Sequence, residues 1–309
     1  MGVLIDGVWH VEDPRPKDAG DGSFKRGNST VRDWIDAEPL PAGHLHLFAA
    51  WNCPWAHRVM LLRVVKGLEA EIGVSYALPR RNDQGWVFDA DGEFADTLFG
   101  ASYLHEAYSK IDPPYTGSAT TPLLWNAGEA RAISNESAEI LRMLNAAYRD
   151  RGPDLAPDHM VDQIDAWNAE IHPKLNNGVY RAGFARTQEA YEAGYRDVFA
   201  MLDKIEAHLV GNRYLCSEQI TEADLRLFPT LVRFDVAYHG AFKCNRNRLI
   251  DMPNLWRYAR ELYALPGVAD TVRFEVYKNG YYSKSELRNP LGIVPLGPDI
   301  NWTPSPSHG

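Results

Sequence analysis

The sequence predicts two domains, an α/β domain of mixed strands and helices followed by a domain made only of helices. Between residues 44 and 150, strand and helix patterns alternate in the order β-α-β and then β-β-α. After the polar stretch DRGPDLAPD at 150–158, the pattern is mostly helical to about residue 277. A chain of 309 residues with 45% hydrophobic content is long enough for two ordinary domains.

Each element of the first domain has a local signature. HLHLFAAW (44–51) has a strand pattern, and PWAHRVMLLRVVKGLE (54–69) places apolar residues at helical spacing before Gly67. Further strands are predicted in IGVSYAL (72–78), TTPLLW (120–125) and ARAIS (130–134), and a second helix in NESAEILRMLNAA (135–147). Residues 79–119 form an unusually long connection, and connections of this length are often functional or disordered.

Composition, and above all the positions of glycine and proline, divides the chain into four parts. Residues 1–43 are rich in glycine, proline and charge, which predicts an irregular N-terminal extension. The α/β domain then spans 44–150 and the helical domain 151–277. Residues 278–309 contain many prolines and glycines and are expected to form a C-terminal tail.

Charge and cysteine content narrow the function classes. The net charge of -9 argues against a nucleic-acid partner and does not suggest attraction to anionic membranes. The N-terminus lacks a secretion signal and no segment is apolar enough to span a membrane, so a cytoplasmic location is expected. Three widely spaced cysteines indicate a reducing compartment, and no metal-binding constellation stands out.

Cys53 is the candidate nucleophile. It lies between a predicted strand and a helix whose first residue is Pro54, so it occupies a helix N-terminus. The unpaired amides and the helix dipole at such a position stabilise a thiolate. Burial and simple packing is the usual fate of a cysteine, but the Cys-Pro pair at this turn favours a reactive role.

Position 56 holds Ala instead of the second cysteine of a redox pair. A lone thiolate that attacks sulfur forms a mixed disulfide, which an external thiol must resolve. Glutathione is the obvious external thiol, so the remaining chemistry should include a glutathione site.

Two motifs fit such a site. A cis bond at Thr121-Pro122 would turn the backbone of Leu123 toward an extended peptide. Glu136 and Ser137 lie at a predicted helix start, where amides, the hydroxyl and the carboxylate could bind a γ-glutamyl group. An ordinary helix N-cap at Asn135 or Ser134 explains the residues at 134–137 equally well.

These motifs, in this order, resemble the glutathione transferase superfamily. Its members have a thioredoxin-like N-terminal domain and an all-helical C-terminal domain. Blocks such as NCPWAHR, DPPYTG, SNESAEILRM, NNGVYRAGFA, TEADLRLFPTLVRFD and NPLGIVPLGP narrow the resemblance to the Xi class, the S-glutathionyl-hydroquinone reductases. The resemblance extends from about residue 24 to 298.

The resemblance implies an enzyme that removes glutathione from S-glutathionyl-hydroquinones through a Cys53 mixed disulfide, giving hydroquinone and glutathione disulfide. It also implies a homodimer whose ligands are glutathione and aromatic glutathione conjugates. The family's site residues match positions of this chain: Cys53 as the nucleophile, Trp86, Leu123, Glu136 and Ser137 toward glutathione, and Tyr180 and Tyr281 toward the aromatic substrate.

The chain departs from the family pattern near the expected substrate side. Ser118 replaces a common basic residue, Gly280 replaces a frequent histidine, and SKSELRNP (283–290) differs from the common SHxxINP. Thr121-Pro122-Leu123 stands for the usual VPV. Such changes are compatible with a different acceptor, for example an α-glutathionyl aryl ketone.

Other readings stay open at this stage. An Omega-like thiol or dehydroascorbate reductase would use Cys53 but need little from Tyr180 or Tyr281. A noncatalytic binding protein for glutathione conjugates would tolerate loss of the thiol. Elsewhere, Thr221 and Asp224 form a capping-box pattern that predicts a structural helix start, and Cys216 and Cys244 are expected to be inert.

Overall fold

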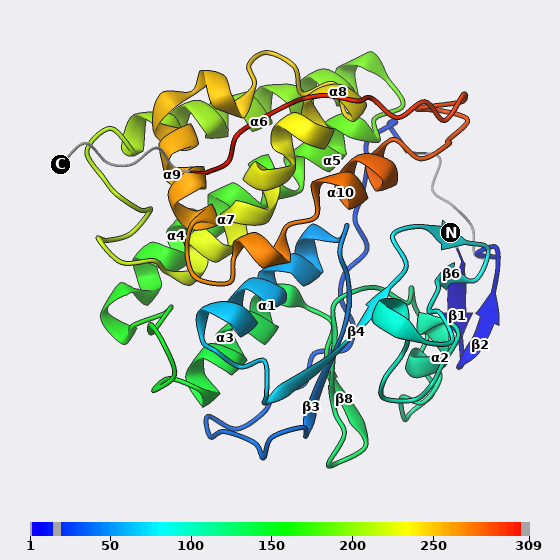
Figure 1. Ribbon diagram of the computed structural model, residues 1–309. Helices are drawn as coiled ribbons and strands as arrows, with labels where there is room; N and C mark the ends of the chain where they lie inside the picture. The colour runs from blue at the N-terminus through cyan, green and yellow to red at the C-terminus, as the bar shows by residue number, and fades with distance from the viewer. Residues whose placement is uncertain (1, 15–19, 304–309) are drawn as a thin grey trace. The chain divides into compact units, whose positions relative to one another are not determined.

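The computed structural model describes residues 2–14 and 20–303, and the chain forms two compact units. The N-terminal unit comprises Met1–Asp18 and Asn28–Gly152, and the C-terminal unit comprises Ala19–Gly27 and Pro153–Gly309. The chain therefore enters the second unit briefly before it completes the first. Figure 1 shows a sheet with helices in the first unit and helices throughout the second.

A four-stranded sheet organises the N-terminal unit. Its strands are β3 (Leu45–Ala50), β4 (Ile72–Ala77), β7 (Leu123–Asn126) and β8 (Arg131–Ser134), in the spatial order β4-β3-β7-β8. β3 pairs with β4 in parallel, whereas β7 is antiparallel to both β3 and β8. Helices α1 (Pro54–Val65) and α3 (Ser137–Ala147) pack on each other beside the sheet (Figure 1). The predicted order of strands and helices is confirmed.

Burial explains why β3 and α1 lie at the centre of this unit. Every residue of β3 is buried, as expected for a central strand covered on both faces. In α1 the chain from Ala56 to Leu62 is buried throughout. The helix ends at Val65, and Gly67 follows with a φ of +63°, which a residue without a side chain adopts at little cost.

The long connection 79–119 is an ordered part of the unit. It contains β5 (Arg81–Asn82), β6 (Gly85–Trp86), the short 3₁₀ helix η1 (Gly92–Phe94) and α2 (Leu104–Tyr108). Phe88 and Phe99 pack against Phe48 of β3, with ring centroids 6.1 and 5.9 Å apart. Aromatic packing thus anchors a segment whose sequence has no regular period.

The sequence predicts an irregular N-terminal extension, but part of this extension has regular structure. β1 (Val3–Ile5) and β2 (Val8–His10) form an antiparallel hairpin. Asp6 and Gly7 join them with positive φ angles of 48° and 77°, the conformation that an Asp-Gly turn favours between two strands. Leu4 also exchanges backbone hydrogen bonds with Gly117, which ties the hairpin to the unit.

The C-terminal unit is helical, as predicted. Its helices are α4 (Val161–Ile171), α5 (Gly178–Gly183), α6 (Gln188–His208), α7 (Glu222–Arg233), α8 (His239–Ala241), α9 (Pro253–Tyr263) and α10 (Phe274–Tyr281). Shorter 3₁₀ turns are η2 (Asp158–Met160), η5 (Leu249–Asp251) and η6 (Ala269–Thr271), and π-helical turns are η3 (His172–Asn176) and η4 (Phe234–Tyr238). α10 runs through the boundary expected at 277/278, so the irregular tail begins after Tyr281.

The start of α7 carries the predicted capping box. The Asp224 carboxylate accepts hydrogen bonds from the N–H and hydroxyl of Thr221 at 2.7 and 2.9 Å. It also accepts from the Leu215 N–H at 3.0 Å and the Tyr258 hydroxyl at 2.7 Å. Asp224 is completely buried, so this one side chain satisfies four donors inside the unit.

Candidate active site

Cys53 is the N-cap of α1. Its φ and ψ of -82° and 114° are extended, and Pro54 follows in the first helical turn. The Ala56 N–H donates to Sγ at 3.4 Å, and the thiol donates to the carbonyl oxygen of Thr121 at 3.3 Å. Sγ therefore sits where a backbone amide can stabilise a thiolate, at the position that the sequence predicts.

The carbonyl beside Sγ belongs to Thr121, the first residue of the Thr121-Pro122 pair that the sequence analysis singles out. The Thr121-Pro122 peptide bond is cis. Leu123, the predicted backbone contact, is completely buried and lies opposite Phe48 in the β3–β7 pair. The Thr121 hydroxyl is buried and has no hydrogen-bond partner among the described residues.

Glu136 and Ser137 begin α3. Glu136 is the N-cap, and its carboxylate accepts from the Ala138 N–H at 3.1 Å and from the Ser29 hydroxyl at 3.0 Å. The Ser137 hydroxyl accepts from Nη1 of Arg58 at 3.2 Å, and both side chains are buried. The N-cap is thus neither Asn135 nor Ser134. A carboxylate, a hydroxyl and a helix N-terminus meet here, and together they suit a zwitterionic γ-glutamyl group.

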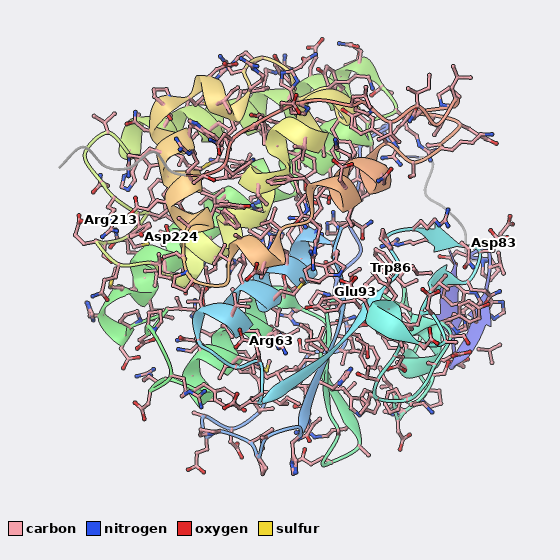
Figure 2. The ribbon with its side chains drawn as sticks, in the orientation of Figure 1. Arg63, Asp83, Trp86, Glu93, Arg213 and Asp224 are labelled. Carbon is pink, nitrogen blue, oxygen red and sulfur yellow. The ribbon has the colours of Figure 1, made fainter. Side chains whose placement is uncertain are left out.

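Trp86, labelled in Figure 2, belongs to the short strand β6. Only 4% of its surface is exposed, and the guanidinium of Arg81 lies 4.1 Å from the ring centroid. Within the part of the chain that the structure describes, its indole N–H has no acceptor. A buried donor without a partner is unusual in a folded protein and calls for an explanation, such as a bound water, ion or ligand.

Tyr180 and Tyr281, which the family resemblance places toward the aromatic substrate, meet within the C-terminal unit. Their hydroxyl oxygens are 2.7 Å apart. A third tyrosine, Tyr238, lies 3.1 Å from the Tyr281 hydroxyl, so three phenols form one hydrogen-bonded chain. Sequence reasoning missed Tyr238, which lies in the π-helical turn η4 and carries no local motif.

The surroundings keep the Tyr238 and Tyr281 phenols protonated. Burial raises the pKa of Tyr238 and of Tyr281 well above the usual value, and the Tyr180 phenol acts in the same direction. The buried Arg233 guanidinium opposes this effect on both groups. A protonated phenol donates a hydrogen bond and can supply a proton, so the cluster suits an oxygen-bearing aromatic ligand.

The other two thiols lack such surroundings. Burial raises the pKa of Cys216 to about 11 and that of Cys244 to about 12, so both remain protonated near neutral pH. This agrees with the prediction that they are inert.

Within residues 2–14 and 20–303, no helix is long and apolar enough to cross a membrane. No group of three or more His, Cys, Asp or Glu side chains there is placed to hold a metal ion.

Comparisons with known proteins define the class. Residues 52–147 match the family described as the N-terminal domain of glutathione S-transferases, and residues 188–261 match the corresponding C-terminal domain. These two matches, in this order, are those of a glutathione transferase.

Full-length relatives are more specific. Glutathionyl-hydroquinone reductase PcpF of Sphingobium chlorophenolicum is 46% identical, with 96% of both chains covered. Glutathionyl-hydroquinone reductase YqjG of Escherichia coli is 42% identical over 96% of this chain and 95% of the relative. A Xi-class enzyme from Natrialba magadii has a TM-score of 0.91 and 36% identity, covering 99% of this chain and 96% of that one. The chain belongs to the Xi class of glutathione transferases, the family of the glutathionyl-hydroquinone reductases.

Proposed function

We propose that the protein is a glutathione-dependent reductase that converts S-glutathionyl-hydroquinones to hydroquinones. The observation that carries the proposal is Cys53 at the N-terminus of α1, with Ala in place of a second cysteine at position 56. The names of PcpF and YqjG support it, because both are glutathionyl-hydroquinone reductases similar along their whole length. A glutathione-bound structure of YqjG, with a TM-score of 0.86 and 38% identity over 97% of this chain and 96% of that one, supports glutathione as the co-substrate.

In the proposed first step, the Cys53 thiolate attacks the sulfur of the conjugate. A bond forms between Sγ and the glutathione sulfur, and the bond from that sulfur to the ring carbon breaks. The ring carbon takes the electron pair and then a proton, so the ring is reduced. Phenol hydroxyls of Tyr180 and Tyr281 are proposed to bind the quinol oxygens and to supply the proton.

In the second step, a glutathione thiolate attacks the mixed disulfide on Cys53. Glutathione disulfide leaves, and the Cys53 thiolate is restored. Two glutathione sulfurs are oxidised while the ring exchanges a carbon–sulfur bond for a carbon–hydrogen bond, so the electrons balance. The substrate therefore supplies the second thiol that the sequence lacks.

The remaining predicted residues are proposed to bind glutathione. Trp86 would cover it, the backbone at Leu123 would pair with its peptide groups, and Glu136 and Ser137 would bind its γ-glutamyl end. The carbonyl oxygen of Thr121, 3.3 Å from Sγ, is a further candidate to accept a hydrogen bond from the peptide backbone of glutathione.

We also propose an aromatic conjugate as the natural substrate class, a homodimer, a cytoplasmic location and a role in quinone detoxification. The free thiols of all three cysteines fit a reducing compartment.

Product analysis tests the proposal. The purified protein is mixed with glutathionyl-hydroquinone and excess glutathione, and hydroquinone and glutathione disulfide are quantified. The wild type should form both products, and the matched control Cys216→Ser should form as much of each product as the wild type does. Cys53→Ser should form neither product. If Cys53→Ser retains turnover, the proposed nucleophile is wrong.

The same assay separates the alternatives. An Omega-like reductase would reduce dehydroascorbate or small disulfides through Cys53 but leave the aryl conjugate intact. An enzyme for α-glutathionyl aryl ketones would cleave those conjugates and spare glutathionyl-hydroquinone. A binding protein would bind glutathione conjugates tightly, turn over none of them and lose nothing in the Cys53→Ser variant.

A further inference from the structure

Arg288 lies beside the aromatic cluster of the C-terminal unit. It follows α10, in a turn where Ser285 and Asn289 pair through their backbones. Its guanidinium carbon lies 4.2 Å from the ring centroid of Phe184 and 5.9 Å from that of Phe242. The side chain is half-buried, so the cation has given up part of its water for the faces of aromatic rings.

No acidic side chain among the described residues forms an ion pair with this guanidinium. Over the ranges that the structure describes, its side chain makes no hydrogen bond and no ion pair, whereas Arg181 and Arg196 of the same unit bind Asp197 and Glu192. Burial lowers the pKa of Arg288, and only the Tyr180 and Tyr281 phenols act in the opposite direction. A partly desolvated cation whose N–H donors have no partner among residues 2–14 and 20–303 can still gain from binding an anion.

Arg288 is also close to the phenol pair. Phe184, which it covers, stacks on Tyr180 with centroids 6.0 Å apart and an interplanar angle of 9°. Phe242, its second aromatic neighbour, lies 5.4 Å from the Tyr281 ring. The cation is therefore one aromatic ring away from the two hydroxyls that are proposed to bind the quinol.

We propose that Arg288 selects conjugates whose aromatic ring carries a carboxylate, which its planar guanidinium would bind in bidentate fashion. This inference rests on the proposed reductase function and names the substrate class within it. The chemistry of turnover is unchanged, because the carboxylate takes no part in breaking the carbon–sulfur bond. The enzyme would thus act best on conjugates of hydroquinone carboxylic acids.

Two conjugates test the proposal: glutathionyl-hydroquinone and the glutathionyl conjugate of 2,5-dihydroxybenzoate, which adds one ring carboxylate. Arg288→Met keeps much of the side-chain packing on Phe184 but removes the charge. It should lower kcat/KM for the carboxylated conjugate by about 10- to 100-fold and change that for the neutral conjugate less than about threefold. Arg288→Lys, which keeps a cation, should recover part of the loss. Arg196→Met, which removes a charge from an exposed ion pair, should preserve the wild-type ratio.

The outcomes separate this inference from the proposed function. If the wild type turns over neither conjugate, the proposed function is wrong. Calorimetry then measures the affinity of the wild type and of Arg288→Met for the two conjugates, and a loss of affinity confined to the carboxylated conjugate supports the role of Arg288. If Arg288→Met loses the same factor on both conjugates, in turnover or in binding, ring-carboxylate recognition is wrong. An equal loss would mean that Arg288 binds the carboxylates of glutathione itself or only supports the aromatic packing.

Discussion

The hydroxyl oxygens of Tyr180 and Tyr281 lie 2.7 Å apart, although 101 positions separate the two residues in the chain. Each hydroxyl fixes the direction of the other, and Tyr238 extends the chain to a fully buried phenol. A ligand oxygen that bound here would meet donors that are already oriented, which lowers the entropic cost of binding.

Replacing Tyr281 with phenylalanine should separate aryl chemistry from sulfur chemistry. The variant keeps the ring but loses a hydroxyl that is proposed to donate a proton, so kcat for glutathionyl-hydroquinone should fall about 100-fold or more. Exchange between glutathione and a small alkyl disulfide needs only Cys53 and should stay within about threefold of wild type. Steady-state rates on both substrates check this. An equal loss on the two substrates would point to a disturbed fold instead.

The Thr121 hydroxyl predicts an unusual stability effect. It is buried without a partner among the described residues, so Thr121→Val should leave stability unchanged or raise it by about 1 kcal/mol. Thr230→Val is the matched control, because its hydroxyl accepts from Asn176 at 2.8 Å and both residues are buried. That control should lose about 1 to 2 kcal/mol. Denaturant unfolding measures both, and a destabilised Thr121→Val variant would mean that the hydroxyl has an important partner.

Asp224, labelled in Figure 2, should be among the most sensitive positions for stability. Asp224→Ala leaves four donors without their acceptor, including the Tyr258 hydroxyl and the Leu215 N–H, and should cost about 3 kcal/mol or more. Asp203→Ala, which removes an exposed ion pair with Arg246, should cost less than about 0.5 kcal/mol. Comparable losses in thermal unfolding of the two variants would contradict this assignment.

His46 should make stability depend on pH. Burial lowers the pKa of His46 from 6.5 to about 4, and its Nε2 lies 2.8 Å from the Ser75 hydroxyl. As the pH falls from 6.5 toward 4, His46 binds a proton in the unfolded chain but stays neutral in the folded state. The contribution of His46 to stability therefore decreases over this window, by roughly 3 kcal/mol in total.

A substitution isolates this effect from other titrating groups. His46→Gln retains a hydrogen-bonding side chain toward Ser75 and removes the titration, so its unfolding midpoint should fall less steeply between pH 6.5 and pH 4 than that of wild type. His159→Gln, at an exposed position, should follow the wild-type curve. Parallel curves for His46→Gln and wild type would show that His46 titrates normally.

Much of the fold could be predicted because its signals are local. β3 and α1 follow from short-range patterns, and Gly67 and Pro54 mark the ends of the helix. The hairpin of β1 and β2 had a local signal too, the Asp6-Gly7 turn, which the surrounding glycine and charge obscured. The order in residues 79–119 had none, because it depends on packing against Phe48, a residue far away in sequence.

The same distinction applies to the candidate site. Cys53 and Glu136 could be placed from sequence because a helix N-terminus is a local feature. Tyr238 and Arg288 could not, because their importance comes from neighbours that lie 43 or more positions away in the chain. The family resemblance pointed to Tyr180 and Tyr281 but gave no sign of the third phenol.

Because residues 20–27 belong to the C-terminal unit, the ribosome makes them well before their contact partners in that unit. Arg26 binds the Asn177 side chain at 2.9 Å, a contact that spans 151 positions. Phe24 packs on Phe184 at 5.3 Å. At about 5 to 20 residues per second, these partners leave the ribosome roughly 8 to 30 s after the segment that needs them. Over this interval the nascent chain lacks Phe184, so the Phe24 ring cannot yet make its native packing contact.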